Sequence, residues 1–281
     1  MAIRLVALDV DGTLLHSDGQ LPENNIYAVR EAAAQGVYMA INSGRTFTEL
    51  PQQVRDDNSY AYYIYSNGAA IADAQGNLLY TQYIRQKAAE NVFSLLFHCD
   101  TIIEVYAHGV PHTQKDQLTP AALDAYSVQN SYRPVVLETR RGVEQIDRFF
   151  AQNAGEVEMF NVFFKYPAQR LLCFEVFSGM PGIKVTTSMP NNLEIFSDRA
   201  DKGSALRFLA NYLGLDRSEL MAVGDSRNDL PMVRFAGTGV AVGNACDALK
   251  TAADLVLPVT NDADAVASVI ETSVLTSRVF A

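Results

Sequence analysis

Apolar runs alternate with amphipathic segments over the first quarter of the chain. Residues 3–8 form an almost unbroken apolar run, which predicts a strand buried on both faces. The pattern returns at residues 37–41 and 62–65, and apolar positions with helical spacing lie between these runs at 22–35 and 46–54. Strands that alternate with helices in this way predict parallel pairing through right-handed crossovers.

The middle of the chain has a different pattern. A turn at residues 73–77 with a second arm at 78–81 predicts a hairpin. Residues 106–139 are polar, contain proline and show little periodicity, whereas 168–177 fit either a helix begun by Pro167 or a strand. The other segments of this region predict helices at 87–97 and 142–150 and strands at 102–106, 159–166, 183–186 and 193–196.

The alternation of apolar runs and helical segments seen at the start of the chain resumes at residue 201. Helices are expected at 201–212, 228–235, 245–251 and 263–271, and short strands at 220–225, 240–242 and 255–257. The 281 residues exceed what one core usually fills, which favours two domains. We predict an α/β fold with a Rossmann-like parallel sheet core, helices on both faces and an inserted mixed α/β domain. The core would comprise residues 1–84 and 190–281, and the insertion residues 85–189.

Composition and charge narrow the classes of function. The net charge of −10 and the pI near 4.9 argue against nucleic acid or an anionic membrane surface as the main partner. No apolar run approaches the length of a membrane span, and the amino terminus lacks a secretory pattern. Cys99, Cys173 and Cys246 are far apart in the sequence and lack metal-binding spacing. We therefore expect buried thiols in a reduced compartment and a soluble, cytoplasmic protein.

The clearest chemical pattern follows the first predicted strand. Asp9-Val10-Asp11-Gly12-Thr13 places two carboxylates two residues apart at its end. Open α/β sheets bind ligands beyond the carboxyl ends of their strands, and two acids there are costly unless a cation or a proton lies between them. An Asx turn explains Asp11 and Gly12 but not Asp9. The pattern therefore predicts a metal-assisted site.

Polar residues also follow three later elements. In Ser43-Gly44-Arg45, Ser43 is either a helix cap or a hydroxyl donor to a phosphoryl oxygen. Lys202 in a first helical turn opposes the helix dipole, so it is either solvated behind Asp201 or close to an anion. Residues 224–229, Gly-Asp-Ser-Arg-Asn-Asp, end another buried strand. Because parallel strands end at one edge, an oxygen-rich cluster suited to magnesium is expected from Asp9, Asp11, Asp225 and Asp229.

These four segments resemble, in order, the four motifs of the haloacid dehalogenase superfamily of phosphotransferases. Residues 67–71 before the insertion and 193–195 after it make the chain similar to the Cof-type phosphatases, whose insertion is a large α/β cap. The resemblance covers nearly all of the predicted core, and the insertion matches in position and size. The chain departs from the family pattern at Ile41-Asn42, where a small residue and threonine are more usual, and at Ala265, where glycine is usual.

The resemblance implies a magnesium-dependent phosphatase for small phosphomonoesters such as sugar phosphates. It implies that Asp9 attacks phosphorus to form an aspartyl-phosphate, and that Asp11 protonates the leaving group and then activates water. It implies a magnesium site formed by the Asp9 and Asp225 carboxylates and the Asp11 carbonyl, with Asp229 behind them. Implied phosphoryl contacts come from Ser43, Gly44, Lys202 and Asn228, and supporting roles fall to Thr13 and Arg45.

Two alternative functions remain open from the sequence. One is a phosphosugar mutase on the same core. The other is a phosphoacceptor or phospho-ligand-binding protein that uses Asp9 without turnover. In the inserted domain, Arg140 and Arg141 are expected to be a solvated pair at a helix entry, with contact to an anionic substrate as the alternative.

Overall fold

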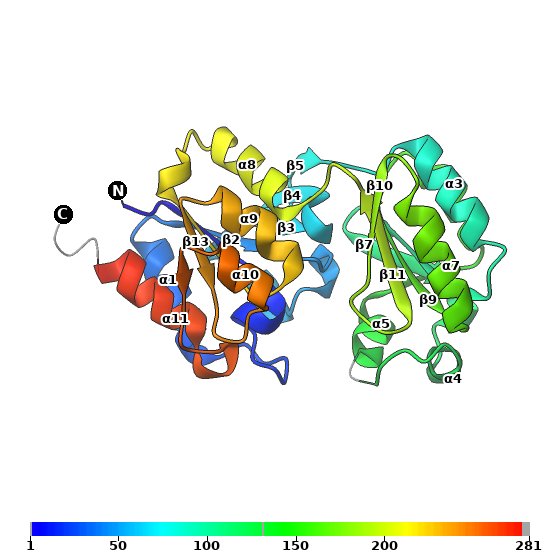
Figure 1. The fold of residues 1–281 in the computed structure, drawn as a ribbon, viewed down its shortest axis with the longest axis horizontal. Coiled ribbons are helices and arrows are strands. Elements are labelled where there is room, and N and C mark those ends of the chain that lie inside the picture. Colours follow the sequence, from blue (N-terminus) through cyan, green and yellow to red (C-terminus); the bar gives the residue numbers. More distant parts are fainter. Residues whose placement is uncertain (1, 131, 277–281) are drawn as a thin grey trace. The chain divides into compact units, whose positions relative to one another are not determined.

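The computed structural model describes residues 2–130 and 132–276 and divides the chain into two compact units (Figure 1). Unit 1 contains the described residues of Met1–Gly44, Leu50–Tyr80 and Asp201–Ala281, and unit 2 those of Arg45–Glu49 and Thr81–Ala200. Within the described residues, no helix is both long enough and apolar enough to cross a membrane.

The sheet of unit 1 has the predicted α/β architecture. Its order, within the described residues, is β14-β13-β12-β1-β2-β3-β4-β5, and the six strands from β14 to β3 run parallel. Register pairs Leu8 of β1 with Ile41 of β2 on one side and with Val223 of β12 on the other, so the residues that follow these strands meet at one edge. The strands are β1 Leu5–Leu8, β2 Tyr38–Asn42, β3 Tyr60–Tyr65, β4 Ala70–Asp73, β5 Leu78–Thr81, β12 Leu220–Gly224, β13 Thr238–Ala241 and β14 Leu255–Val256.

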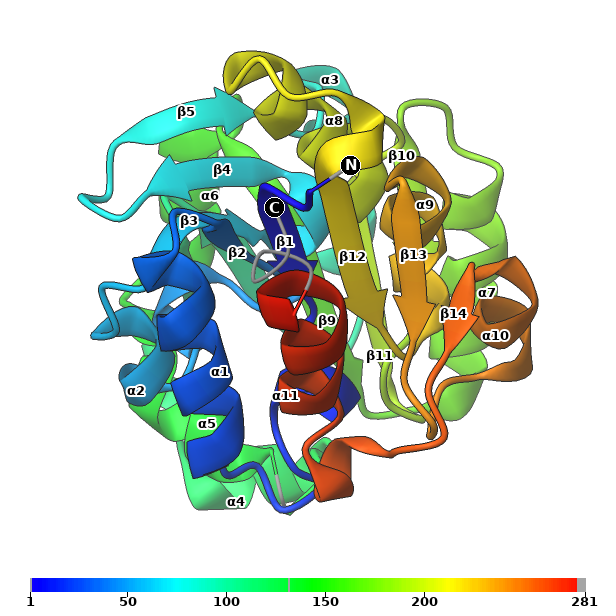
Figure 2. The same ribbon diagram turned by 90° about the vertical axis from the view of Figure 1, so that its left-hand side faces the viewer.

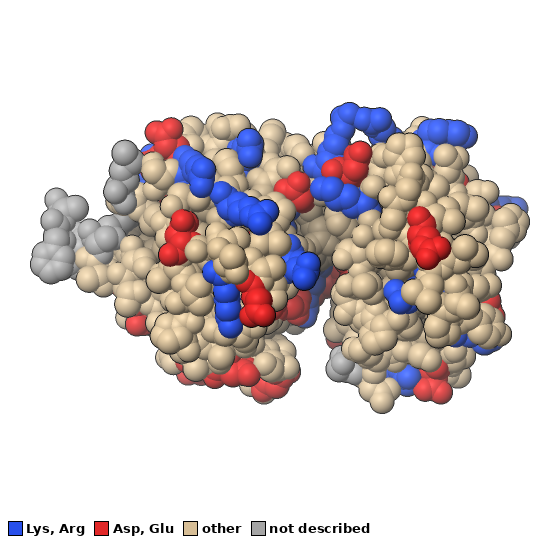
Figure 3. All heavy atoms as spheres, viewed as in Figure 1, with Lys and Arg blue, Asp and Glu red and all other residues tan. Residues whose placement is uncertain are grey.

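Helices cover both faces of this sheet. Figure 2 shows α1 and α11 on one face and α8, α9 and α10 on the other. The helices of unit 1 are α1 Glu23–Ala34, α2 Gln52–Arg55, α8 Lys202–Tyr212, α9 Leu230–Phe235, α10 Asp247–Ala252 and α11 Ala265–Ile270. Basic and acidic side chains are interspersed over the face of unit 1 seen in Figure 3, but Lys202 is only 1% exposed and does not contribute to this surface charge.

Unit 2 is a mixed α/β domain around a second sheet, with the order β10-β11-β9-β6-β7-β8 in the described residues. Helices α3, α6 and α7 contribute side chains to an apolar cluster. Within it, the rings of Phe93 and Phe150 stack on each other with centroids 4.1 Å apart. A smaller cluster contains Leu123 of α4 and Val136 of α5. The elements are α3 Gln86–Leu96, β6 Thr101–Ala107, β7 Val110–Gln114, α4 Pro120–Ala125, α5 Arg133–Thr139, β8 Arg141–Val143, α6 Ile146–Asn153, β9 Val157–Phe164, α7 Pro167–Ser178, β10 Ile183–Thr186 and β11 Asn192–Ser197.

Several predicted elements differ from the structure. The helix predicted over 46–54 is divided into a short turn at Phe47–Glu49 and α2, because proline at position 51 cannot continue a helix. The helix predicted over 142–150 begins as strand β8 and becomes helical from Ile146. Residues 168–177, which fitted a helix or a strand, belong to helix α7.

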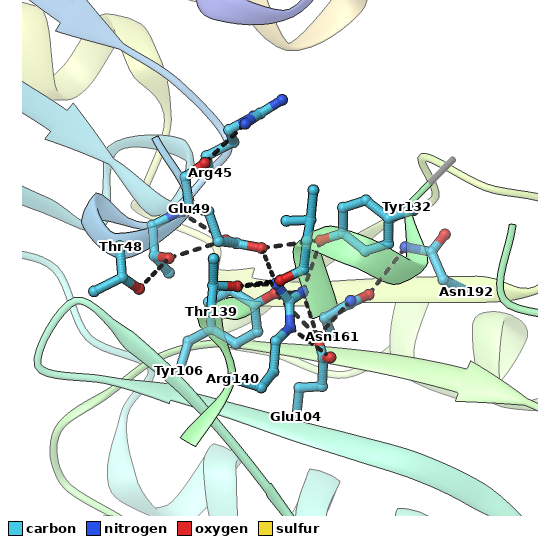
Figure 4. A network of polar contacts seen from close by, with 12 residues as sticks. Arg45, Thr48, Glu49, Glu104, Tyr106, Tyr132, Thr139, Arg140, Asn161 and Asn192 are labelled. Carbon is cyan, nitrogen blue, oxygen red and sulfur yellow. Dashed lines mark hydrogen bonds and ion pairs between the residues drawn. The ribbon is translucent and has the colours of Figure 1, made fainter. Parts of the chain in front are cut away.

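Arg140 is neither solvated nor available to an anionic substrate, contrary to both expectations for it. Its side chain is fully buried, and its guanidinium donates to Glu49 Oε1 at 2.6 Å and to Glu104 Oε1 at 2.8 Å (Figure 4). Tyr106 and Tyr132 also contact the guanidinium, through their hydroxyls and their rings. The chain therefore contains a buried ion network in unit 2 that local sequence patterns do not indicate.

Two of the three cysteines lie close together in the folded chain, although they are far apart in the sequence. Cys99 and Cys173 are separated by 74 residues in the sequence, but their sulfur atoms lie 4.0 Å apart in unit 2. Both are free thiols, and burial together with Cys99 raises the pKa of Cys173 to about 12. The Cys173 thiol is thus kept protonated in a largely apolar environment.

Candidate active site

The site is built at the carboxyl ends of β1 and β12. The backbone N–H of Asp9 donates to the carbonyl of Val223 at 3.0 Å, which continues the pairing of the two strands one residue past β1. Gly12 in the following turn has a φ of +74°, and a Cβ atom there would lie 2.6 Å from Asp225 Oδ2. Glycine is therefore needed both for the backbone conformation and for the close approach of the two segments.

Lys202 lies at the centre of this group of carboxylates. Its Nζ donates to Asp9 Oδ1 and to Asp229 Oδ1, each at 2.6 Å. Burial would lower the pKa of Lys202, but Asp229 and Asp9 raise it above its ordinary value, so the ammonium stays charged. Asp201 caps the helix by accepting the N–H of Ser204 at 2.7 Å, which fixes the turn that carries the lysine.

The carboxylates around Lys202 repel one another. Burial and the negative charge of Asp229 raise the pKa of Asp9 well above its ordinary value, and Lys202 offsets only part of this effect. Burial and Asp229 also raise the pKa of Asp225 to about 6. Asp229 itself is held firmly, because its Oδ2 accepts the backbone N–H groups of Asp225 at 3.0 Å and Ser226 at 2.9 Å.

This arrangement fits a divalent cation. Asp9, Asp225 and Asp229 each offer a carboxylate oxygen, and these oxygens lie within 4.8 Å of one another. Asp225 Oδ1 is buried and has no hydrogen-bond partner among the described residues, which is costly for a carboxylate oxygen. A hard cation would satisfy this oxygen and relieve the repulsion that raises the two pKa values.

A second group of polar residues lies beside β2. The N–H of Ser43 donates to the carbonyl of Ile64 at 2.9 Å, and the carbonyl of Ser43 accepts the N–H of Asn67 at 3.1 Å. The side chain of Asn67 in turn accepts from Asn228 Nδ2 at 3.1 Å, which links the loops that follow β2, β3 and β12. Asn67 was not among the predicted site residues, although it follows the third buried strand.

The remaining predicted site residues differ in their exposure and in the unit to which they belong. Asp11 is exposed in the turn after β1, whereas Thr13 is fully buried and its hydroxyl has no partner among the described residues. Gly44 packs against the side chain of Asn67. Arg45 belongs to unit 2, where its guanidinium donates to the carbonyl of Glu49 at 2.7 Å. Unit 1 therefore brings together Asp9, Lys202, Asp225 and Asp229, and a linked group of Ser43, Gly44, Asn67 and Asn228.

Comparison with known proteins agrees with this geometry. A family model for haloacid dehalogenase-like hydrolases matches residues 6–270. The chain is 30% identical to Phosphatase YwpJ of Bacillus subtilis, with 96% of this chain and 99% of the relative covered. It is also 30% identical to 5-amino-6-(5-phospho-D-ribitylamino)uracil phosphatase YcsE of the same organism, with 97% and 96% covered.

Solved structures show the same fold. A haloacid dehalogenase-like hydrolase from Bacteroides thetaiotaomicron superposes with a TM-score of 0.81 at 26% identity, covering 96% of this chain and 98% of that one. The family match spans both units and includes every residue of the carboxylate and lysine cluster. The chain therefore belongs to the haloacid dehalogenase-like hydrolase family.

Proposed function

We propose that this chain is a magnesium-dependent phosphatase that hydrolyses small phosphomonoesters through an aspartyl-phosphate on Asp9. The observation that carries the proposal is the position of Asp9. Its carboxylate is buried, one oxygen is held 2.6 Å from Lys202 Nζ, and the unsatisfied oxygen of Asp225 belongs to the same cluster. A carboxylate fixed in this way is ready for nucleophilic attack and needs no general base.

The main barrier to this reaction is repulsion between the Asp9 carboxylate and the anionic phosphoryl group. Lys202 reduces that repulsion, because its buried ammonium lies beside Asp9 and Asp229 keeps it in place. Ser43 and Gly44 would bind phosphoryl oxygens from the β2 side, and Asn228, hydrogen-bonded to Asn67, would bind them from the β12 side. These contacts hold the phosphorus in line with the attacking oxygen.

Asp11 would move the protons. It lies two residues after the nucleophile and is exposed, so a leaving group and then a water molecule can reach it. In the first step Asp11 gives its proton to the departing ester oxygen. In the second step it takes a proton from the water that attacks the phosphoryl group on Asp9, and inorganic phosphate is released.

Magnesium would be held by Asp9, Asp225 and the carbonyl oxygen of Asp11, with Asp229 orienting the loop that carries Asp225. When bound, the ion supplies positive charge that offsets the repulsion between the carboxylates and the phosphoryl group. The unpartnered oxygen of Asp225 and the raised pKa values of Asp9 and Asp225 support its presence.

A small phosphomonoester is the substrate class that these features support. The curated relatives named above are phosphatases, and one is named for 5-amino-6-(5-phospho-D-ribitylamino)uracil. The net charge of −10 makes a long polyanion a poor substrate, whereas a single phosphoryl group needs only the local charge of Lys202 and a cation.

Phosphate release from a panel of phosphorylated metabolites, with and without magnesium, tests the proposal. We expect multiple turnovers that require the ion and that are lost on chelation. Turnover that is equally fast in chelator would contradict the metal assignment. A mutase would instead transfer the phosphoryl group between positions on a sugar, and a phosphoacceptor switch would release at most one phosphate per chain.

A further inference from the structure

Asn42 is a buried polar residue that the proposed mechanism does not use. It ends β2, it is fully buried, and its Nδ2 donates to the backbone carbonyl of Lys202 at 3.0 Å. Its Oδ1 is also buried and has no partner among the described residues. A half-satisfied buried amide destabilises a fold compared with an apolar residue, so packing alone does not explain an asparagine here.

The register of the sheet places Asn42 beside the nucleophile. Leu8 pairs with Ile41, so the next residues along the two parallel strands are Asp9 and Asn42. Asn42 therefore lies next to the strand that carries Asp9 and is hydrogen-bonded to the helix that carries Lys202. Its side-chain hydrogen bond connects β2 to the first residue of α8.

The backbone of Lys202 is also confined by Gly68. Gly68 has a φ of +87°, and a Cβ atom there would lie 2.3 Å from the carbonyl oxygen of Asp201 and 3.1 Å from the backbone nitrogen of Lys202. The turn that follows β3 thus packs directly against the peptide bond that precedes the lysine. The start of α8 is held by an amide from β2 and by backbone contact with the next loop along the sheet.

We infer that Asn42 is a positioning residue that fixes the backbone of Lys202, so that its ammonium stays between Asp9 and Asp229. This inference rests on the proposed function for its catalytic consequence. A lysine side chain has four rotatable bonds. The ion pairs of its ammonium group therefore hold that group near the carboxylates but do not fix the backbone from which the side chain extends. Holding the backbone as well keeps the charge in place while Asp9 attacks, when Asp9 loses part of its negative charge.

Hydrogen exchange tests the structural half of the inference without any activity. Asn42→Leu removes the amide at similar volume, and Asn42→Ala serves if the leucine variant does not fold. We expect exchange of the Ser204 and Ala205 amides, which donate to Asp201 in the first turn of α8, to rise about five-fold or more. Asn25→Leu is the matched control, because Asn25 is equally buried and its Nδ2 donates to the Leu14 carbonyl at 2.9 Å. In that control the first turn of α8 should exchange as in the parent.

A kinetic cycle tests the catalytic half. With p-nitrophenyl phosphate and magnesium, Asn42→Leu should lower kcat about ten-fold when Lys202 is present and less than two-fold in a Lys202→Met background. Equal losses in both backgrounds, or unchanged exchange in the first turn of α8, would overturn the inference. If the parent chain shows no turnover with any phosphomonoester, the proposed function fails, and the exchange measurement alone decides whether Asn42 holds Lys202.

Discussion

Within the described residues, each unit contains one buried lysine or arginine side chain, and the two differ in how completely the surrounding carboxylate oxygens are hydrogen-bonded. Lys202 in unit 1 and Arg140 in unit 2 both have fully buried side chains, and each lies between two carboxylates. In unit 2 both oxygens of Glu49 and both oxygens of Glu104 accept hydrogen bonds, and all three guanidinium nitrogens donate. In unit 1 the neighbouring Asp225 keeps one buried oxygen without a partner among the described residues.

The pKa values of the carboxyl groups in the two clusters reflect how completely their oxygens are hydrogen-bonded. Burial would raise the pKa of Glu49, but Arg140 and the hydrogen bonds from Thr46 and Tyr132 outweigh it and lower the pKa. Asp9 and Asp225, by contrast, have raised pKa values because Lys202 does not compensate for burial and mutual repulsion. A complete network stabilises one conformation, whereas an incomplete one leaves a carboxylate available for a ligand and a reaction. The comparison indicates that unsatisfied groups, rather than buried charge alone, distinguish a candidate site from a structural network.

The largest effect should come from removing Asp9, the proposed nucleophile of the incomplete cluster. Asp9→Asn should reduce phosphate release by roughly 10³-fold or more. Its free energy of unfolding at pH 7 should equal or exceed that of the parent, because Lys202 keeps Asp229 and one repelling charge is gone. Initial rates and urea unfolding check the two halves. Parental turnover in this variant would show that another group attacks phosphorus.

Removing the cation of the complete network should act on stability instead. Arg140→Met leaves Glu49 and Glu104 buried without a counter-charge, which should cost about 3–5 kcal/mol of unfolding free energy. Urea unfolding measures this loss, and Arg141→Met is the matched control because Arg141 is exposed. A loss below about 1 kcal/mol would show that water reaches the network and that it is not closed.

The effect of removing the exposed Asp11 carboxylate on the rate of hydrolysis should depend on the leaving group. Asp11→Asn should slow hydrolysis of an alkyl or sugar phosphate by about 10²-fold, because an alkoxide needs a proton as it departs. A nitrophenyl ester needs less help and should be slowed less. Rates for the two ester types compare the effects directly, and equal slowing would argue against Asp11 as the acid.

The contributions of Asp225 and Glu49 to the free energy of unfolding should change with pH in opposite directions. The folded-state pKa of Asp225 is raised from 3.8 to about 6, so without magnesium its contribution to stability falls as pH rises through that interval. The pKa of Glu49 is lowered from 4.5, so its stabilising contribution is present above that value and is lost as the pH falls. Each slope is at most about 1.4 kcal/mol per pH unit.

Variants separate these two slopes. Urea unfolding between pH 2.5 and 7 should lose the Asp225-dependent slope in Asp225→Asn and the Glu49-dependent slope in Glu49→Gln. Saturating magnesium should also remove the first, because the ion binds the ionised form of Asp225. A stability curve for the parent that Asp225→Asn does not alter over this range would contradict the raised pKa.

The sequence predicted the parallel core of unit 1 well, because its strands are continuous apolar runs and three of the four motifs directly follow one, whereas the Lys202 motif begins helix α8. It predicted unit 2 less well. Strand β7 contains proline at position 111, and α4 and α5 are each no longer than seven residues, so periodicity was too weak to define them. The helix predicted at 46–54 was wrong because proline at position 51 interrupts it, and residues Arg45–Glu49 belong to unit 2.

The buried polar residues show most clearly what a single sequence lacks. Arg140 was expected at the surface because its partners are 36 and 91 residues away in the chain, and no local pattern connects them. Asn42 was noted only as a departure from a family pattern, since its hydrogen bond to Lys202 spans 160 residues. Residue types that follow buried strands can be read from the sequence, but the hydrogen bonds that satisfy them depend on the fold.

Identification of the phosphorylated residue tests the central claim most directly. Enzyme quenched in acid during turnover with magnesium and a phosphomonoester is reduced with borohydride, which converts an aspartyl-phosphate into homoserine, and its peptides are sequenced by mass spectrometry. The account predicts homoserine in the place of Asp9 in the parent. Reduction at any other residue, or at none in rapidly quenched enzyme that is turning over, would contradict it.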